Sequence, residues 1–303
     1  MRPHFDWRLR TRTLALGART LVMGVVNVTP DSFSDAGRFF DPVRAFEHGL
    51  RLLDEGADIL DIGGESTRPG ARVVADRPEH ARPAPARIAV TAEEELRRVL
   101  PVIEALHCLR PDAVISVDTY KSEVARAAVA AGAEIVNDVS AFAWDPAMAA
   151  TVADLDCGAV LMHTRGRPDE WRHLPPAGDP FALVSRELSA SADTALAAGV
   201  AREHLVLDPG FGFGKNYEEN YPLLARFAEF HRLGFPLLAG VSRKSFIGRA
   251  IARGGMPLPA EDRLYGSLAA LAIAILHGAH LVRVHDVRPS VEAAALADAI
   301  LHA

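Results

Sequence analysis

Eight short apolar runs in the sequence each end in polar side chains, and these are the residues whose types could do chemistry. Asp118, Asn137 and Asp208 end three of the runs and offer oxygen acceptors together with one amide donor. Such a set suits a flat heterocycle with an amino group and a ring N–H, because a carboxylate can hold both through two parallel hydrogen bonds. One Asp or Asn at such a position is weak evidence, since it can equally cap the following helix. Polar ends on all eight runs indicate a site.

A second group of residues after the same runs carries positive charge. It consists of Arg68, Lys244, Arg283 and His285, and Asn27 adds a neutral oxygen that suits a hard cation. This combination suits a phosphorylated group held with Mg²⁺, which takes oxygen ligands and keeps some of its waters. Residues 242–245 precede an apolar stretch, so a short helix that begins there would direct backbone N–H groups at an anion.

The elements that must position these residues alternate along the chain. Short runs rich in Val, Ile and Leu predict strands buried on both faces, and the amphipathic stretches between them predict helices. The expected strands are residues 21–26, 58–62, 113–117, 134–136, 158–162, 205–207, 236–239 and 281–284. The expected helices are residues 43–55, 92–106, 122–131, 146–154, 180–198, 218–232, 260–276 and 290–302. Glycine before most of the strands predicts where the preceding helix ends.

This alternation predicts an α/β protein with a single (β/α)8 TIM barrel over residues 1–303. An open doubly wound sheet would be expected to carry a Gly-rich dinucleotide turn after its first strand, and none is present there. Alternating hydrophobic residues at 5–17 predict a short N-terminal β-hairpin that caps the bottom of the barrel. Residues 72–90 are rich in Arg and Pro without periodicity, which predicts a flexible insertion after the second strand. In such a barrel the site lies at the C-terminal ends of the strands.

The composition argues against several classes of protein. The chain has 303 residues, 49% of them hydrophobic, and a net charge of −6, so it carries no strongly basic surface for nucleic acid or an anionic membrane. No apolar run approaches the ~18 residues of a membrane helix, and the N-terminus lacks the pattern of a signal peptide. A cytoplasmic protein is therefore expected. Cys108 and Cys157 lie in apolar surroundings and are expected to be buried and reduced.

Six longer stretches resemble the dihydropteroate synthase family. They are NVTPDSFSDAG from Asn27, DIGGESTRPGA from Asp61, VDTYK from Val117, DPGFGFGK from Asp208, GVSRKSFIG from Gly240 and RVHDV from Arg283. The stretches span nearly the whole chain in the family's order, which is far more specific than one short motif. The resemblance implies a pterin-binding TIM barrel that joins 6-hydroxymethyl-7,8-dihydropterin diphosphate to p-aminobenzoate. Diphosphate is released, and the product is 7,8-dihydropteroate for folate synthesis.

The resemblance also implies roles for single residues. The residues implied for the pterin are Asp118, Asn137, Met162, Asp208, Phe213, Lys244 and Arg283. Those implied for the diphosphate are Asn27, Arg283 and His285, with the Mg²⁺ cofactor on Asn27. Those implied for p-aminobenzoate, at the site where sulfonamides compete, are Phe33, Thr67, Arg68 and Ser245. The expected catalytic residues are Arg68, Asp118, Asp208 and Lys244, because carboxylates can stabilise positive charge that spreads onto the pterin as diphosphate departs.

Two other functions stay open at this stage. A pterin-dependent methyltransferase module would share Asp118, Asn137 and Asp208, but not the first two loops. A catalytically silent paralogue would bind pterins without turnover, and the insertion at 72–90 could disable the reaction in that way. The family is often homodimeric through late barrel helices, and the apolar stretch 260–276 permits such an interface. We therefore expect small-molecule substrates, a homodimer, and neither nucleic-acid nor membrane partners.

Overall fold

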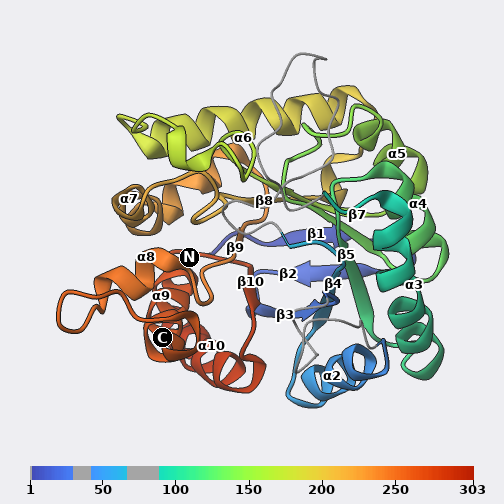
Figure 1. The fold of residues 1–303 in the computed structure, drawn as a ribbon, viewed down its shortest axis with the longest axis horizontal. Coiled ribbons are helices and arrows are strands. Elements are labelled where there is room, and N and C mark those ends of the chain that lie inside the picture. Colours follow the sequence, from blue (N-terminus) through green and yellow to red (C-terminus); the bar gives the residue numbers. More distant parts are fainter. Residues whose placement is uncertain (1, 30–41, 67–88) are drawn as a thin grey trace.

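The centre of the molecule is a ring of parallel strands (Figure 1). The computed structural model describes residues 2–29, 42–66 and 89–303. The strands of the ring are β3 (Leu21–Asn27), β4 (Ile59–Gly63), β5 (Val114–Asp118), β6 (Ile135–Asp138), β7 (Gly158–Met162), β8 (Leu205–Asp208), β9 (Leu238–Ala239) and β10 (Leu281–Val284). Their order is β8-β7-β6-β5-β4-β3-β10-β9, and a parallel bridge between Leu207 and Leu237 joins the two ends. The predicted TIM barrel is confirmed.

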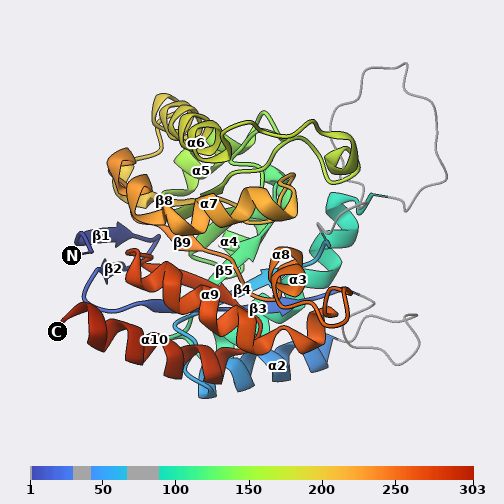
Figure 2. The same ribbon diagram turned by 90° about the vertical axis from the view of Figure 1, so that its left-hand side faces the viewer.

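The helices form a layer around the strands, as the two perpendicular views show (Figures 1 and 2). They are α2 (Pro42–Asp54), α3 (Ala92–Leu109), α4 (Ser122–Ala130), α5 (Met148–Leu155), α6 (Pro180–Ala197), α7 (Asn220–Ala225), α8 (Ser245–Ala250), α9 (Leu264–Leu276) and α10 (Val287–Leu301). Two of them begin at side-chain caps: Thr91 accepts from the N–H of Glu94, and Asp179 accepts from the N–H of Ala182. Among the described residues, no helix is long and apolar enough to cross a membrane.

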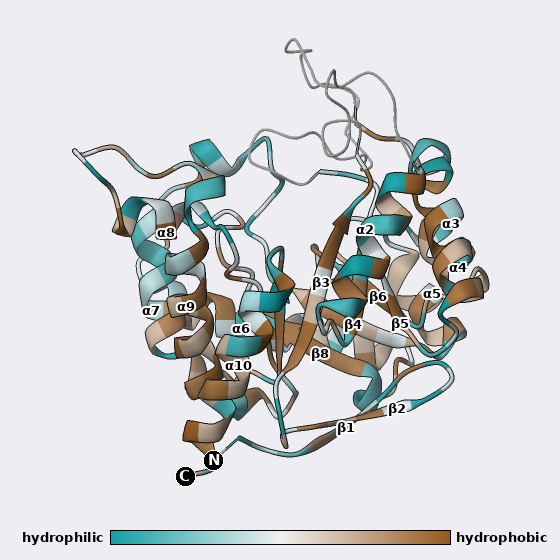
Figure 3. Ribbon diagram, turned by 90° about the horizontal axis from the view of Figure 1, so that it is seen from below, coloured by the Kyte–Doolittle hydropathy of each residue, from teal (hydrophilic) through white to brown (hydrophobic). Residues whose placement is uncertain are grey.

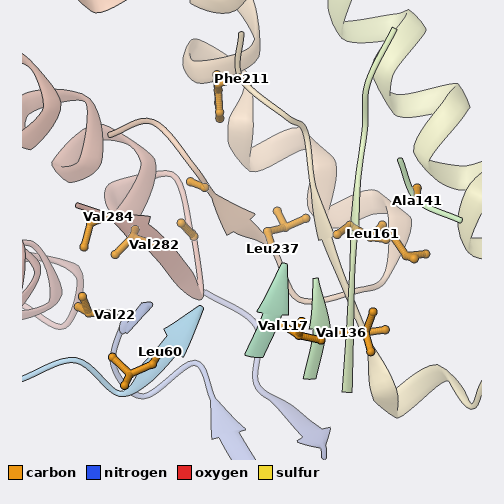
Figure 4. Close-up of a cluster of buried hydrophobic side chains, with 14 of the residues drawn as sticks. Val22, Leu60, Val117, Val136, Ala141, Leu161, Phe211, Leu237, Val282 and Val284 are labelled. Carbon is orange, nitrogen blue, oxygen red and sulfur yellow. The ribbon is translucent and has the colours of Figure 1, made fainter. Parts of the chain in front are cut away.

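The side chains of each strand alternate between two apolar clusters, because successive residues of a strand point to opposite faces. On β3, Val22 and Val26 belong to the cluster between the strands and the helices, while Leu21 and Met23 belong to the cluster inside the barrel. Figure 4 shows part of the outer cluster, with Val22 among the labelled side chains. Both faces of the strands are therefore buried, and β3 and β8 are coloured as largely hydrophobic in Figure 3.

The N-terminal hairpin closes the barrel at the end where the strands begin. It consists of β1 (Phe5–Arg8) and β2 (Thr13–Leu16), which pair antiparallel with Trp7 opposite Leu14. Trp7 is fully buried in the inner cluster, and its Nε1 donates to the carbonyl of His204 at 2.8 Å. Figure 3 shows the hairpin across this end of the barrel. The predicted hairpin cap is confirmed.

Two predicted helices are interrupted in the structure. The segment 218–232 divides into short 3-10 helices at Tyr217–Glu219 and Phe227–Leu233 with α7 between them. Arg226 leaves helical geometry at φ −104° and ψ 16°, and the change of direction buries Phe227 and Phe230 completely. The segment 260–276 begins with a 3-10 helix at Ala260–Asp262, and α9 follows. The prediction of single continuous helices was wrong at both places.

The two cysteines differ from each other. Both are free thiols, and Cys157 is buried as predicted, whereas Cys108 is exposed. Cys108 lies in the last turn of α3, whose buried positions are those facing the strands, such as Ile103 and Leu106. The prediction of a buried Cys108 was wrong, because a residue two positions after Leu106 lies on the outer side of the helix. Most of the predicted insertion at 72–90, up to residue 88, lies outside the described residues.

Candidate active site

Within the barrel, the inward-facing residues change from apolar to polar towards the C-terminal ends of the strands. The apolar inner cluster includes Ile59 of β4, Val114 of β5, Val206 of β8 and Leu281 of β10. Side chains two positions further along a strand share the same face. Those positions hold Asp61, Ser116, Asp208 and Arg283. The strands therefore place a layer of polar and ionisable groups directly above an apolar plug.

Arg283 is the hub of this polar layer. Its Nε donates to Oδ2 of Asp61 at 2.6 Å, and its Nη2 donates to Oδ2 of Asp118 at 2.6 Å. Asp61 is fully buried and also accepts from Oγ of Ser116 at 2.7 Å and from Nδ2 of Asn137 at 3.0 Å. One buried carboxylate thus orients an arginine and an amide that come from two other strands.

A pocket lies above this layer, and it contains every residue predicted to hold the pterin. Its lining is Asp118, Asn137, Val139, Met162, Asp208, Phe211, Phe213, Gly240, Ser242, Lys244, Arg283 and His285. The lining combines the acidic groups Asp118 and Asp208 with the basic groups Lys244 and Arg283, and it includes the aromatic ring of Phe213. This composition suits a flat, hydrogen-bonding ring with an anionic substituent.

The turn between β9 and α8 presents Lys244 to this pocket. Arg243 has φ 56°, in the left-handed region, and is held there by hydrogen bonds. Its backbone N–H donates to Oγ of Ser267 at 2.9 Å, and its guanidinium pairs with Asp286. Strained backbone of this kind is typical of functional sites. The Nζ of Lys244 lies 4.0 Å from the ring centroid of Phe213.

Burial in the pocket shifts the pKa of Asp118, Asp208 and Lys244. Burial raises the pKa of Asp118 to about 7, against the opposing charge of Arg283. Burial also raises the pKa of Asp208 to about 6, against the N–H of Gly210 and the charges of Lys244, Lys215 and Arg283. Burial lowers the pKa of Lys244 to about 8, and the charge of Arg283 lowers it further. These groups lack the solvation that a polar ligand would supply.

His285 stands between the pocket and a neighbouring groove. The groove is lined by Val25, Asn27, His48, Arg51, Leu52, Glu55, Arg243, His285, Asp286, Arg288 and Pro289. Burial lowers the pKa of His285 to about 3, and the charges of Arg283, Arg243 and Lys244 lower it further, so its imidazole is neutral at pH 7. Asn27 borders the groove and not the pocket. Of the three residues predicted for the diphosphate, Asn27 and His285 line the groove, whereas Arg283 lines the pocket, and His285 lines both.

The residues predicted for p-aminobenzoate are only partly described. Phe33, Thr67 and Arg68 lie outside the described residues, so the catalytic role of Arg68 stays a prediction. Ser245 is exposed at the first position of α8 and does not line the pocket.

The base of the second loop, just before Thr67, is described and firmly held. Lys121 is nearly buried and forms ion pairs with Glu65 and with Glu95. The Nη1 of Arg98 donates to the carbonyl of Gly64 at 2.7 Å. Helices α3 and α4 thus fix the point from which the second loop begins.

The sequence assigned no role to Asp61, which lies inside β4. A single carboxylate in the apolar run ILDIG was the available signal. Phe211 is fully buried between Phe227 and Phe246, so it is a core aromatic that also closes the back of the pocket. The carboxylate of Asp138 accepts hydrogen bonds from Ser140 and from the backbone N–H of Phe142, so it stabilises the turn after β6.

Comparison with known proteins gives the same assignment as the pocket. Residues 23–285 match the family model described as "Pterin binding enzyme". The dihydropteroate synthase of Escherichia coli is 45% identical over 282 residues, which is 93% of this chain and 92% of that protein.

Two solved structures have the same fold over nearly their whole length. The structure of Xanthomonas albilineans dihydropteroate synthase with 4-aminobenzoic acid is 45% identical, with a TM-score of 0.85 and 100% of both chains covered. The Yersinia pestis dihydropteroate synthase in a sulfonamide drug complex is 40% identical, with a TM-score of 0.84 and 98% of both chains covered.

The barrel, its pocket and the family match define a pterin-binding enzyme of the TIM-barrel class. More narrowly, the chain belongs to the dihydropteroate synthase family. Its activity is accordingly that of a transferase in folate synthesis. The methyltransferase alternative has no support from these matches, and the resemblance of the six sequence stretches is confirmed.

Proposed function

We propose that the pocket holds the pterin of 6-hydroxymethyl-7,8-dihydropterin diphosphate by its polar edge. Asp208 and Asp118 accept hydrogen bonds from the amino group and ring N–H groups, and Asn137 is kept in place by Asp61. A ligand that donates to both carboxylates replaces the water they lose on burial, so it favours their charged forms. Lys244 donates from the opposite side, and Arg283 and Phe213 border the ring's faces.

The same groups suit the departure of diphosphate. As the bond from the pterin methylene carbon to the diphosphate oxygen breaks, positive charge develops on the pterin and negative charge on the diphosphate. Asp118 and Asp208 stabilise the former, while Arg283 and neutral His285, an N–H donor, face the latter. The amine of p-aminobenzoate then attacks the methylene carbon with its own lone pair, and the nitrogen afterwards loses one proton, which the released diphosphate can accept. Arg68, Thr67, Ser245 and Phe33 remain the residues predicted to hold p-aminobenzoate.

We propose Mg²⁺ as the cofactor, with Asn27 as its protein ligand. No group of three His, Cys, Asp or Glu residues in the described part of the chain could hold a metal by itself. An amide oxygen beside a diphosphate site fits Mg²⁺, which is commonly bound by few protein ligands together with substrate phosphates and water. When bound, the ion would neutralise charge on the departing diphosphate.

One observation carries the proposed function: all the residues predicted to bind the pterin line a single pocket. Arg283, one of these residues, is held in place by Asp61. The test is to incubate the purified protein with the pterin diphosphate, p-aminobenzoate and Mg²⁺, and to assay dihydropteroate by chromatography. Product is expected from the wild-type chain and not from a Lys244→Met control. No product under conditions in which the Escherichia coli enzyme turns over would favour the silent paralogue.

We also propose that the chain is a homodimer through α9 and α10. Tyr265, Ile273 and Leu276 form an exposed apolar stripe on α9, and Leu296 and Ile300 continue it on α10. A second copy of the same stripes would bury them. An Ile273→Glu/Leu296→Glu variant is expected to be monomeric by light scattering after size exclusion; an unchanged mass for a dimeric wild type would overturn this interface. The cytoplasmic location remains a prediction from the sequence.

A further inference from the structure

Lys215 is a buried cation that has no carboxylate within ion-pair distance among the residues the structure describes. It is 7% exposed, and its Nζ donates to the carbonyl oxygens of His163 at 3.2 Å, Gly210 at 2.7 Å and Phe213 at 3.1 Å. An ammonium group has three N–H donors, so these three bonds use all of them. A neutral side chain would avoid the cost of burying a charge, so the charge itself must serve a purpose other than packing.

The three carbonyls belong to the turns that follow β7 and β8, and these turns border the pterin pocket. The turns approach each other very closely: a Cβ on Gly210, which has φ +66°, would lie 1.9 Å from the carbonyl oxygen of His163. Phe213 lies in the second turn, where its ring packs edge-to-face on Trp171 at 5.3 Å. The direction of this ring therefore depends on how the two turns are joined.

Gly210 also connects Lys215 to the pocket floor. Its N–H donates to Oδ1 of Asp208 at 2.7 Å, while its carbonyl accepts from Lys215 at 2.7 Å. We propose that Lys215 is a positioning residue for pterin binding: it clamps the two turns so that Phe213 forms the pocket wall, and it keeps positive charge behind Asp208. This inference rests on the proposed role of Asp208 in holding the pterin.

The charge behind Asp208 has a measurable consequence. The largest charged influences on Lys215 are Asp208, Lys244, Arg165 and Glu187, and burial lowers the pKa of Lys215 to about 7. The neighbouring imidazole of His163 has a pKa that burial and the charge of Lys215 lower to about 4, so it stays neutral from pH 5 to pH 8. Lys215 is thus mostly charged near pH 6, where Asp208 titrates, and it lowers the pKa of Asp208 together with Lys244 and Arg283. Removing the charge raises the pKa of Asp208 further. Pterin binding needs the charged Asp208 carboxylate, so on acidification the affinity of such a variant is lost at a higher pH than that of the wild type.

The experiment measures the dissociation constant of the pterin diphosphate from pH 5 to pH 8 by calorimetry, for the wild type, Lys215→Met and Lys215→Gln. For Lys215→Met, the acidic fall in affinity should move up by about half a pH unit or more, with affinity at pH 7 about tenfold weaker. Lys215→Gln retains N–H donors without charge, so it should show the same pH shift with a smaller loss at pH 7. If Lys215→Met does not fold, the pH shift of Lys215→Gln alone tests the role of the Lys215 charge.

Arg165→Met is the matched control. Arg165 supports the same turn through the carbonyl of Gly214 at 3.3 Å, but its charge is not among the largest influences on the pKa of Asp208, which include Lys215. The affinity of Arg165→Met for the pterin diphosphate should fall at the same acidic pH as that of the wild type. The inference would be overturned if affinity fell at the same pH in both Lys215 variants as in the wild type and only their unfolding temperature were lower. A wild type that does not bind the pterin diphosphate at all would instead overturn the proposed function.

Discussion

The two ends of the barrel differ in how completely their buried charges are paired. At the hairpin end, Arg2 is 5% exposed and donates to Gly17, Thr20 and Ala279, and it pairs with Asp298 at 3.0 Å. At the pocket end, Asp208 is 3% exposed, and neither it nor Lys244 has an ion-pair partner among the described residues. The hairpin end matches Arg2 with partners from the chain, whereas the pocket end pairs Arg283 with Asp61 and Asp118 but leaves Asp208 and Lys244 without an ion-pair partner among the described residues.

This difference separates stability from function. Charges that find partners inside the chain stabilise the folded state, whereas buried charges without partners cost stability and are typical of sites that a ligand completes. It agrees with the general behaviour of TIM barrels, in which the end where the strands begin supports the fold and the opposite end carries the chemistry. Substitutions at the two ends should therefore affect different measurements.

The largest effect is expected from Asp208→Asn at the pocket end. The amide cannot stabilise positive charge on the pterin, so kcat/KM should fall on the order of 10³-fold. Because burial raises the pKa of Asp208, removal of the charge should leave the unfolding temperature unchanged or higher. Steady-state kinetics and calorimetry check both parts. A clear loss of thermal stability would mean that Asp208 supports the fold.

Trp7→Ala is the counterpart at the hairpin end. Trp7 is fully buried inside the barrel, so its truncation should lower the free energy of unfolding by about 3–5 kcal/mol. Denaturant titration measures this loss. The KM for both substrates should stay within about twofold of the wild type at a temperature where the variant is folded. Leu14→Ala, at a half-buried position of the same hairpin, is the milder control.

The pH dependence should run in opposite directions for binding and for stability. Burial raises the pKa of Asp118 to about 7 and that of Asp208 to about 6, so pterin affinity should fall by up to about tenfold per pH unit below that range. The ligand-free protein takes up those protons while folded. Its stability, as far as these carboxyls contribute, is therefore greater at pH 5.5 than at pH 8. Parallel curves for affinity and stability would contradict the comparison.

The smallest effect is expected from Phe213→Leu. The lost aromatic contact should weaken pterin affinity by about 0.5–1.5 kcal/mol, a severalfold rise in its dissociation constant. Phe211→Leu is the matched control, because Phe211 is fully buried among Phe227 and Phe246 and should affect stability more than affinity. Equal effects on affinity would contradict the assignment of Phe213 to the pocket wall and of Phe211 to the hydrophobic core.

The sequence predicted the barrel well because its strands have strong local signals. Gly158–Met162 and Leu281–Val284 were predicted with the observed bounds, and the other six strands within two residues at each end. The break at Arg226 was missed because a hydrophobic pattern of helical spacing does not show where the chain turns to bury Phe227 and Phe230. That turn is set by packing between distant parts of the chain.

The sequence indicated which residues line the pocket, but not the side-chain hydrogen bonds that join them across different strands and turns. Motifs after the strands located the pocket lining, including Asp118, Asn137 and Lys244. Asp61 and Lys215 were missed because their importance lies in which other strands and turns their side chains reach, and sequence spacing carries no such information. Charges without partners, such as Lys244, become visible only when burial is known.

The most direct test of the division between the two ends measures two quantities on the same samples. The unfolding temperature and the dissociation constant of the pterin diphosphate would be determined for the wild type, Asp208→Asn and Trp7→Ala at pH 7.5. The predicted result is a large loss of affinity without thermal destabilisation for Asp208→Asn, and the reverse for Trp7→Ala. A loss of affinity and of thermal stability together in both variants would contradict it.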